Sequence, residues 1–125
     1  MLYRGMKDDG DGHPACGPSA RMLGVRLEGD IPISQSGEVE TGTGGLSVAI
    51  AGPENLIRHR RPPEYGGVGP DPVWEIDEAD LPHALVFRID PANRLRHGFI
   101  EPRDPMSFAA FQIALASSRG FWVRT

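Results

Sequence analysis

The stretch "ALVFRIDPANRLRHGFIEPRDPM" (residues 84–106) carries the clearest fold information in this chain. Residues 84–90 have a clear strand pattern, and the turn sequence "DPAN" joins them to a second strand-like segment at 94–101. This order predicts an antiparallel hairpin. Two prolines then stop the second strand. The hairpin therefore ends by presenting His97 and Glu101 close to the start of a helix.

The segment after the hairpin, residues 107–119, is the one durable helix that the sequence predicts. Ser107 is a good N-cap, and Gly120 ends the helix. Apolar residues recur at roughly helical spacing and would form one face of the helix. They are Phe108, Phe111, Ile113, Ala114 and Leu115.

Outward from the hairpin, the pattern predicts further short strands. They cover residues 1–4, 21–27, 46–50 and 73–76, whereas 28–45 has the composition of a loop. Pro53 favours the start of a short, weaker helix, which the diproline after Arg61 must end. The predicted fold is a single α+β domain over residues 1–125, dominated by antiparallel sheet and followed by one C-terminal helix.

Bulk composition excludes several classes of protein. With 125 residues, 39% apolar and 24% charged, the chain fits one globular domain. Its net charge of −4 argues against non-specific nucleic-acid binding, which depends on a basic face. Cys16 is the only cysteine, so the fold needs no disulfide and suits a reducing cytoplasm. No apolar run approaches the roughly 18 residues of a membrane span, and we expect no signal peptide.

Common cofactor motifs are also missing. The four histidines are scattered, and no two of them occupy the ligand spacing of a metal site. The "GTGG" sequence at 42–45 lacks the preceding strand and the following helix that a phosphate-binding loop requires. We therefore expect neither a metal site nor a nucleotide-binding fold of that type.

Two groups at the ends of predicted strands are candidates for ligand contact. Arg4 lies at the end of the first predicted strand, where a guanidinium is costly to place unless it meets an anion. Gly45 and its neighbouring glycine would let the backbone approach a ligand closely, and Ser47 follows them in the strand. The alternatives are an arginine that lies at the surface or pairs with an acidic neighbour, and a serine that fills a sheet after an ordinary glycine turn.

Strand alternation places His97, Phe99 and Glu101 on one face of the second hairpin strand. His97 and Glu101 would be about 13 Å apart at roughly 3.3 Å per residue, too far for a direct acid–base pair. They would contact different parts of one extended ligand, or form a solvent-facing stripe.

The sequence "RHRRPPEYGG" (58–67) is a candidate substrate loop. Clustered arginines favour phosphate binding, although such a cluster also forms a solvated face. Tyr65 and Trp74 are the aromatic residues that we would first expect to stack on a ligand ring. Core packing is the alternative for Trp74, and the one that we favour.

The order of three motifs resembles a known family. "LYR" at residues 2–4, "GGLSV" at 44–48 and "HGFIEPRDPM" at 97–106 stand in the order of an N-terminal "LYR", a central "GGTSV" and a late "H-x-x-I-x-P-x-x-PM". These motifs are similar to those of small type VI secretion effectors with an ADP-ribosyltransferase-like fold. The resemblance spans nearly the whole chain. It departs at Leu46, where the family has a threonine beside the serine.

The resemblance implies a bent, split β-sandwich around a cleft that takes NAD as a substrate. It implies that Arg4 anchors phosphate or ribose, that Ser47 supports the nicotinamide ribose and that His97 faces the same cleft. Gly45 and Tyr65 are added here as cofactor-binding candidates on the local grounds above. Glu101 is added as the carboxylate that would stabilise an oxocarbenium-like sugar, with Glu64 and Glu75 as other acidic candidates.

The function implied is an NAD-dependent ADP-ribosyltransferase toxin that acts in the cytoplasm of a target cell after secretion. A cognate immunity protein would neutralise it, and its target macromolecule is left open. One alternative is a toxin of the same fold that blocks a macromolecular partner without catalysis. Another is a non-toxic binding module or immunity-type protein, which the modest charge and low helix content of this chain disfavour.

Overall fold

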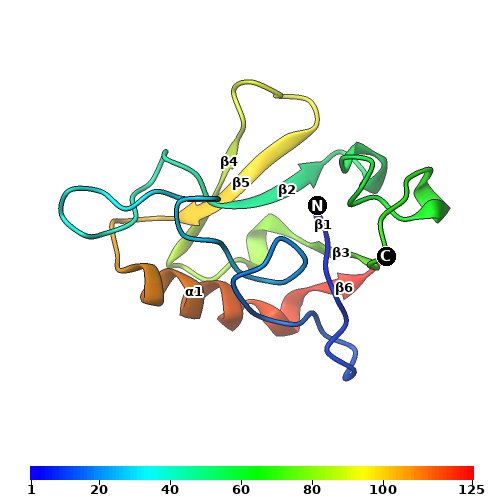
Figure 1. Cartoon of the computed structure of the whole chain (residues 1–125), viewed down its shortest axis with the longest axis horizontal. Coiled ribbons are helices and arrows are strands. Elements are labelled where there is room, and N and C mark those ends of the chain that lie inside the picture. The colour runs from blue at the N-terminus through cyan, green and yellow to red at the C-terminus, as the bar shows by residue number, and fades with distance from the viewer.

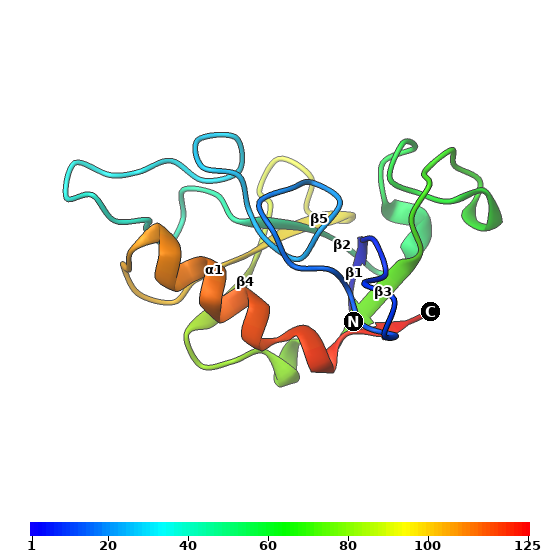
Figure 2. The ribbon, with the colours of Figure 1, turned by 60° about the horizontal axis from the view of Figure 1, so that its bottom comes forward.

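The computed structural model describes the whole chain, residues 1–125. Six strands form one antiparallel sheet in the order β4-β5-β2-β1-β3-β6. Their bounds are Leu2–Gly5 (β1), Leu46–Ile50 (β2), Val73–Ile76 (β3), Leu85–Ile89 (β4), His97–Pro102 (β5) and Val123–Arg124 (β6). One helix, α1 (Phe108–Ser117), follows β5, and both chain termini lie at the β1–β3–β6 end of the sheet (Figures 1 and 2). The predicted α+β class, with antiparallel sheet and one C-terminal helix, is therefore confirmed.

The predicted hairpin and helix are present with small changes. β4 and β5 pair from Leu85↔Pro102 to Ile89↔Gly98, but residues 94–96 belong to the turn and not to the strand. Ser107 caps α1 because its hydroxyl accepts a hydrogen bond from the Ala110 amide. The apolar face was wrong at one position, since Ile113 is 70% exposed.

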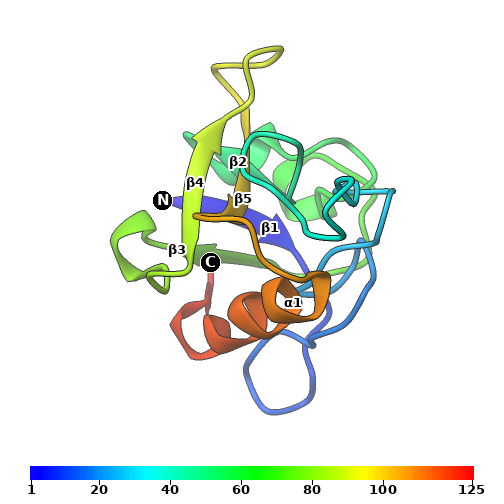
Figure 3. The same cartoon turned by 90° about the vertical axis from the view of Figure 1, so that its left-hand side faces the viewer.

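α1 packs on the sheet through three residues. Phe111, Ala114 and Leu115 belong to a cluster of 16 buried residues that also contains the inward side chains of the sheet. Figure 3 shows the helix lying along one side of the strands. Trp74 is fully buried in this core, and its indole N–H donates to the Met6 carbonyl at 2.8 Å, which confirms the core-packing interpretation for this residue. No helix in this chain has the length and apolar character that crossing a bilayer needs.

The predicted strand at 21–27 was wrong. This segment makes only isolated bridges, Cys16↔Leu23 and Leu27↔Ile31, although Leu23 and Val25 are buried. The Val25 amide donates to the Gln112 side chain at 2.9 Å, and the Gln112 amide returns a bond to the Val25 carbonyl at 3.0 Å. A helix side chain thus takes the place of a neighbouring strand.

Two other elements also differ from prediction. The weak helix after Pro53 is a single 3₁₀ turn, Pro53–Asn55, and two further short turns follow it before β4. The two-residue strand β6 was not predicted, because it is exposed and too short to show alternation.

The sheet opens between its two central strands. β1 pairs with β2 through only two residue pairs, Leu2↔Ile50 and Tyr3↔Ala49, and then continues beside β3 alone. At Gly5, an added Cβ atom would lie 2.8 Å from the Arg60 carbonyl oxygen, so the loop around Arg60 approaches β1 where the strands part. This opening is here called the split.

We predict that Gly45→Ala destabilises the protein by about 2 kcal/mol, a usual cost of overpacking. An added Cβ at Gly45 would overlap the Ile100 carbonyl oxygen of β5. Gly120→Ala is the matched control, because no heavy atom lies within 4 Å of its added Cβ. Urea unfolding of both variants measures the difference, and equal stability of the two would contradict the prediction.

Candidate functional site

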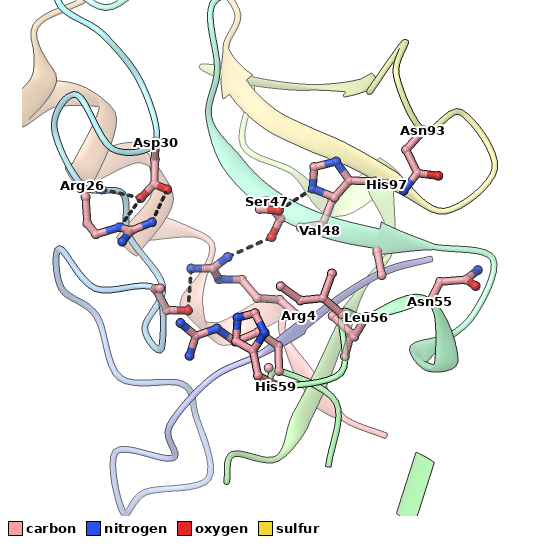
Figure 4. A pocket seen from close by; sticks show the side chains of 15 residues that line it. Arg4, Arg26, Asp30, Ser47, Val48, Asn55, Leu56, His59, Asn93 and His97 are labelled. Atoms are coloured by element: carbon pink, nitrogen blue, oxygen red, sulfur yellow. Dashed lines mark hydrogen bonds and ion pairs between the residues drawn. The ribbon is translucent and has the colours of Figure 1, made fainter. Parts of the chain in front are cut away.

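A pocket of about 390 Å³ lies at the split. β1 contributes Arg4 and Gly5, and β2 contributes Ser47 to Ala49. The loop after the 3₁₀ turn at Pro53–Asn55 and the segment around Asp30 close two other sides, as Figure 4 shows. A cavity of this volume is in the range of small-molecule sites.

Arg4 is buried at the base of the split. Its Nη1 donates to the Ser47 carbonyl at 2.8 Å, while Nε and Nη2 donate to the carbonyls of Met22 and Ala20. A guanidinium has five N–H groups. Four of them make these bonds, which leaves one N–H on Nη1 free at the pocket.

The contact from Arg4 replaces a missing piece of the sheet. Tyr3 faces Ala49 in the ladder, so Ser47 would face Gly5 if the pairing continued. The strands have diverged at that point, and the Arg4 side chain binds the Ser47 carbonyl instead. Burial lowers the pKa of Arg4 to about 10, an effect that Arg60 and Arg26 add to and Asp30 opposes. The guanidinium is thus a desolvated cation without an ion-pair partner.

His97 lies beside Ser47 in the pocket. Its Nε2 makes a short hydrogen bond to the Ser47 hydroxyl, and its Nδ1 lies 2.8 Å from the Asp90 carboxylate. The contact follows from sheet register, because Ser47 faces Phe99 and Ala49 faces His97. Ser47 and His97 are therefore diagonal neighbours on one face of the sheet.

Asp90 was not among the candidates from sequence. It follows β4 in the "DPAN" turn, where its other carboxylate oxygen accepts the Ala92 amide at 2.9 Å. The hydrogen bond with His97 is the main cause that holds the pKa of Asp90 below its usual value. The predicted hairpin register could have found it, since Ile89 pairs with Gly98 and the next opposed residues are Asp90 and His97.

Glu101 is on the same face as His97, as alternation predicts, but it does not line the pocket. It is 1% exposed, is bound to Arg88 at 3.0 Å and accepts the Gly42 amide at 2.9 Å. Arg88 in turn stacks on Phe99, whose ring contacts the edge of His97. Phe99 and Arg88 thus separate Glu101 from His97, and the carboxylate ties the loop at residue 42 to β5.

The two remaining sequence candidates also lie outside the pocket lining. Gly45 is buried against the backbone of Ile100, so its close approach is to β5 and not to the pocket. The Tyr65 hydroxyl lies 2.9 Å from Thr125 near the C-terminus. The structure thus brings together Arg4, Ser47 and His97, and leaves Gly45, Tyr65 and Glu101 elsewhere.

The charges that line the pocket are mainly positive. Three arginines, Arg4, Arg26 and Arg60, face one carboxylate, Asp30. Asp30 is already bound to Arg26 at 3.0 Å, and although burial opposes the change, this contact keeps the pKa of Asp30 below its usual value. Arg60 makes no side-chain hydrogen bond, and Arg58 does not line the pocket. The arrangement favours an anionic ligand.

Groups of three or more potential metal ligands are absent. Comparison with known protein families, curated proteins and solved structures finds no match to this chain. The pocket at the split and the side chains that it brings together are therefore the basis for proposing a function.

We predict that the contact between Asp90 and His97 stabilises the fold only while the carboxylate is charged. The folded-state pKa of Asp90 lies below its ordinary 3.8, so this contribution is fully present above pH 3.8 and is lost as the pH falls through the folded-state value. Thermal unfolding of wild type and Asp90→Asn, followed by circular dichroism, measures it. The wild type should melt higher above pH 3.8, and the difference should close at lower pH. A difference independent of pH would contradict this.

Proposed function

We propose that this protein is an NAD-dependent ADP-ribosyltransferase-like toxin. The observation that carries the proposal is the convergence of Arg4, Ser47 and His97, from three different strands, on one cationic pocket at the split. These are the residues that the resemblance of the sequence assigns to the cleft. In the proposed finer description of the fold, the split divides the sheet into the two halves of a bent β-sandwich.

The electrostatics of the pocket support a diphosphate-bearing substrate. Arg4 offers a free, desolvated N–H, and Arg60 offers an uncommitted guanidinium. Hydrogen bonds from buried arginine to phosphate oxygens are among the stronger polar contacts in proteins. In this proposal Arg4 and Arg60 hold the diphosphate, and the Ser47 hydroxyl and the Asn55 amide are the neutral groups available to ribose hydroxyls.

The carboxylate that would stabilise the ribose cation is not Glu101, the residue that the sequence analysis chose. Loss of nicotinamide breaks the C–N glycosidic bond and leaves positive charge on the ribose, which a nearby anion stabilises. Glu101 is bound to Arg88 outside the pocket, whereas Asp30 is the one carboxylate in the lining. Asp30 is therefore our candidate for this role.

The proposed setting is the cytoplasm of a target cell after secretion, with a cognate immunity protein as the inhibitor. Arg4, Arg26 and Arg60 make the pocket positive, and the exposed Arg58 precedes His59 of the lining in the chain. An inhibitor with an acidic surface would be steered to this region and would cover the pocket. The target macromolecule and the modified residue are left open.

The test compares expression in a bacterial cytoplasm with NAD binding by the purified protein. Arg60→Ala should weaken NAD binding about tenfold, the expected cost of losing a charged hydrogen bond, because it removes a pocket guanidinium that makes no hydrogen bond within the protein. Arg58→Ala is the matched control and should bind NAD like wild type. Growth arrest should be lost in Ser47→Ala and His97→Ala at equal protein level.

Two results would overturn the proposal. No NAD binding by the wild type, measured by calorimetry, would remove the substrate. Growth arrest that persists in Ser47→Ala and His97→Ala but is lost in Arg58→Ala would favour the alternative, a toxin that blocks a macromolecular partner without catalysis.

A further inference from the structure

We propose that Ser47, His97 and Asp90 form a nucleophilic serine centre that transfers acyl groups from esters whose acyl chain carries an anion. This activity goes beyond the proposed NAD chemistry and needs no NAD. It rests on a hydrogen-bonded row of three side chains, two on the neighbouring strands β2 and β5 and one in the turn after β4. The resemblance to ADP-ribosyltransferases assigns no role to the third, Asp90.

The row has the order that serine activation requires. Ser47 Oγ is hydrogen-bonded to His97 Nε2, and His97 Nδ1 lies 2.8 Å from Asp90 Oδ2. With its Nδ1 proton held by the carboxylate, the imidazole presents an unprotonated Nε2 to the hydroxyl. A serine, a histidine base and an orienting carboxylate in this order are recognised by geometry and not by their positions in sequence.

The row is also held in place from outside. The Asp90 carboxylate accepts the Ala92 amide, and the His97 and Phe99 rings pack in a T-shaped arrangement at a centroid distance of 4.8 Å. Ser47 is on the exposed side of β2, so its hydroxyl faces the pocket and not the core. The serine is thus both oriented and accessible, the two conditions for reaction with a ligand.

The pocket supplies positive charge, which would stabilise the negative charge that develops in the reaction. Arg4 Nη1 binds the carbonyl of Ser47 itself, and its free N–H in the same pocket would be a donor for an oxyanion formed at the serine. Arg60 lies in the same lining and would hold an anion on the far end of the acyl chain. The substrate class is therefore a short ester with a terminal carboxylate.

The step balances within these residues. Ser47 Oγ forms a bond to the carbonyl carbon while its proton passes to His97 Nε2. The ester C–O bond then breaks, and the alcohol leaves with that proton. Water repeats the sequence on the acyl-serine and releases the acid. Asp90 is a positioning residue, because it acts through His97 and does not touch the substrate.

A fluorophosphonate probe tests the nucleophile in the purified full-length protein without NAD. We expect stoichiometric labelling at Ser47, located by mass spectrometry, and no labelling in Ser47→Ala. Asp90→Asn keeps an oxygen that can accept the Ala92 amide, so the turn is preserved. It should slow labelling on the order of a hundredfold or more, the usual contribution of general-base catalysis. Ser36→Ala and His83→Ala are matched controls outside the pocket and should label at the wild-type rate.

Substrate class is tested with two esters of equal length, the para-nitrophenyl monoester of adipic acid and para-nitrophenyl hexanoate. Wild type should prefer the adipate about tenfold in kcat/KM, and Arg60→Ala should remove the preference. Absence of labelling at Ser47 in wild type would overturn the proposal. Labelling that is unchanged in folded Asp90→Asn would overturn the relay and leave Asp90 with a turn-forming role. If Asp90→Asn does not fold, labelling that is unchanged in folded His97→Gln would overturn activation of Ser47 by the histidine.

The labelling experiment tests the serine centre separately from the NAD-dependent function proposed above. NAD binding that persists without serine labelling would remove the nucleophilic centre alone. Labelling and ester turnover without NAD binding would remove the transferase proposal alone.

Discussion

A single buried guanidinium connects the two halves of the sheet. Arg4 lies where β1 and β2 part, and it binds the Ser47 carbonyl that would otherwise lack a partner. The same group binds the carbonyls of Ala20 and Met22, so it also fixes the loop that closes one side of the pocket. A desolvated cation of this kind is stable only while its carbonyl partners surround it. The shape of the pocket and the position of Ser47 both depend on that condition.

The polar side chains that could act on a ligand in the pocket come from the hairpin as much as from β1, which carries Arg4. β5 brings His97 to Ser47, and the turn after β4 brings Asp90 to His97. The next residues along the same face carry Arg88, Phe99 and Glu101, which pack on one another and hold the far end of β5. One end of this face of the two strands therefore lies at the pocket, and the other end holds the sheet together.

Local patterns were sufficient to predict most regular elements. The alternating hairpin, the glycine-bounded β2 and the Ser107 cap each report on neighbouring residues, and all three are present. The segment at 21–27 has the burial of a strand but obtains its hydrogen bonds from Gln112, 87 positions from Val25. No local pattern can show such a long-range partner.

The sequence predicted those site residues whose positions follow from motif order and from the alternation of side chains along a strand. Motif order singled out Arg4, Ser47 and His97, and the structure brings them together. Glu101 was placed on the correct face, but Arg88, its diagonal neighbour on β4, binds its carboxylate away from the pocket. Asp30 was missed because it lies in an irregular loop whose path depends on the fold as a whole.

The short pairing between β1 and β2, here the seam of the sheet, has a consequence for the order of folding. β4 and β5 are joined by a short turn, so their pairing closes a small loop at little entropic cost. Joining β1 to β2 closes forty residues of irregular chain, and only two residue pairs compensate for that loss. We therefore expect the hairpin to form early and the seam late. His97 and Asp90 would then meet before the pocket around them exists, and the burial of Arg4 would be the step that completes the native state.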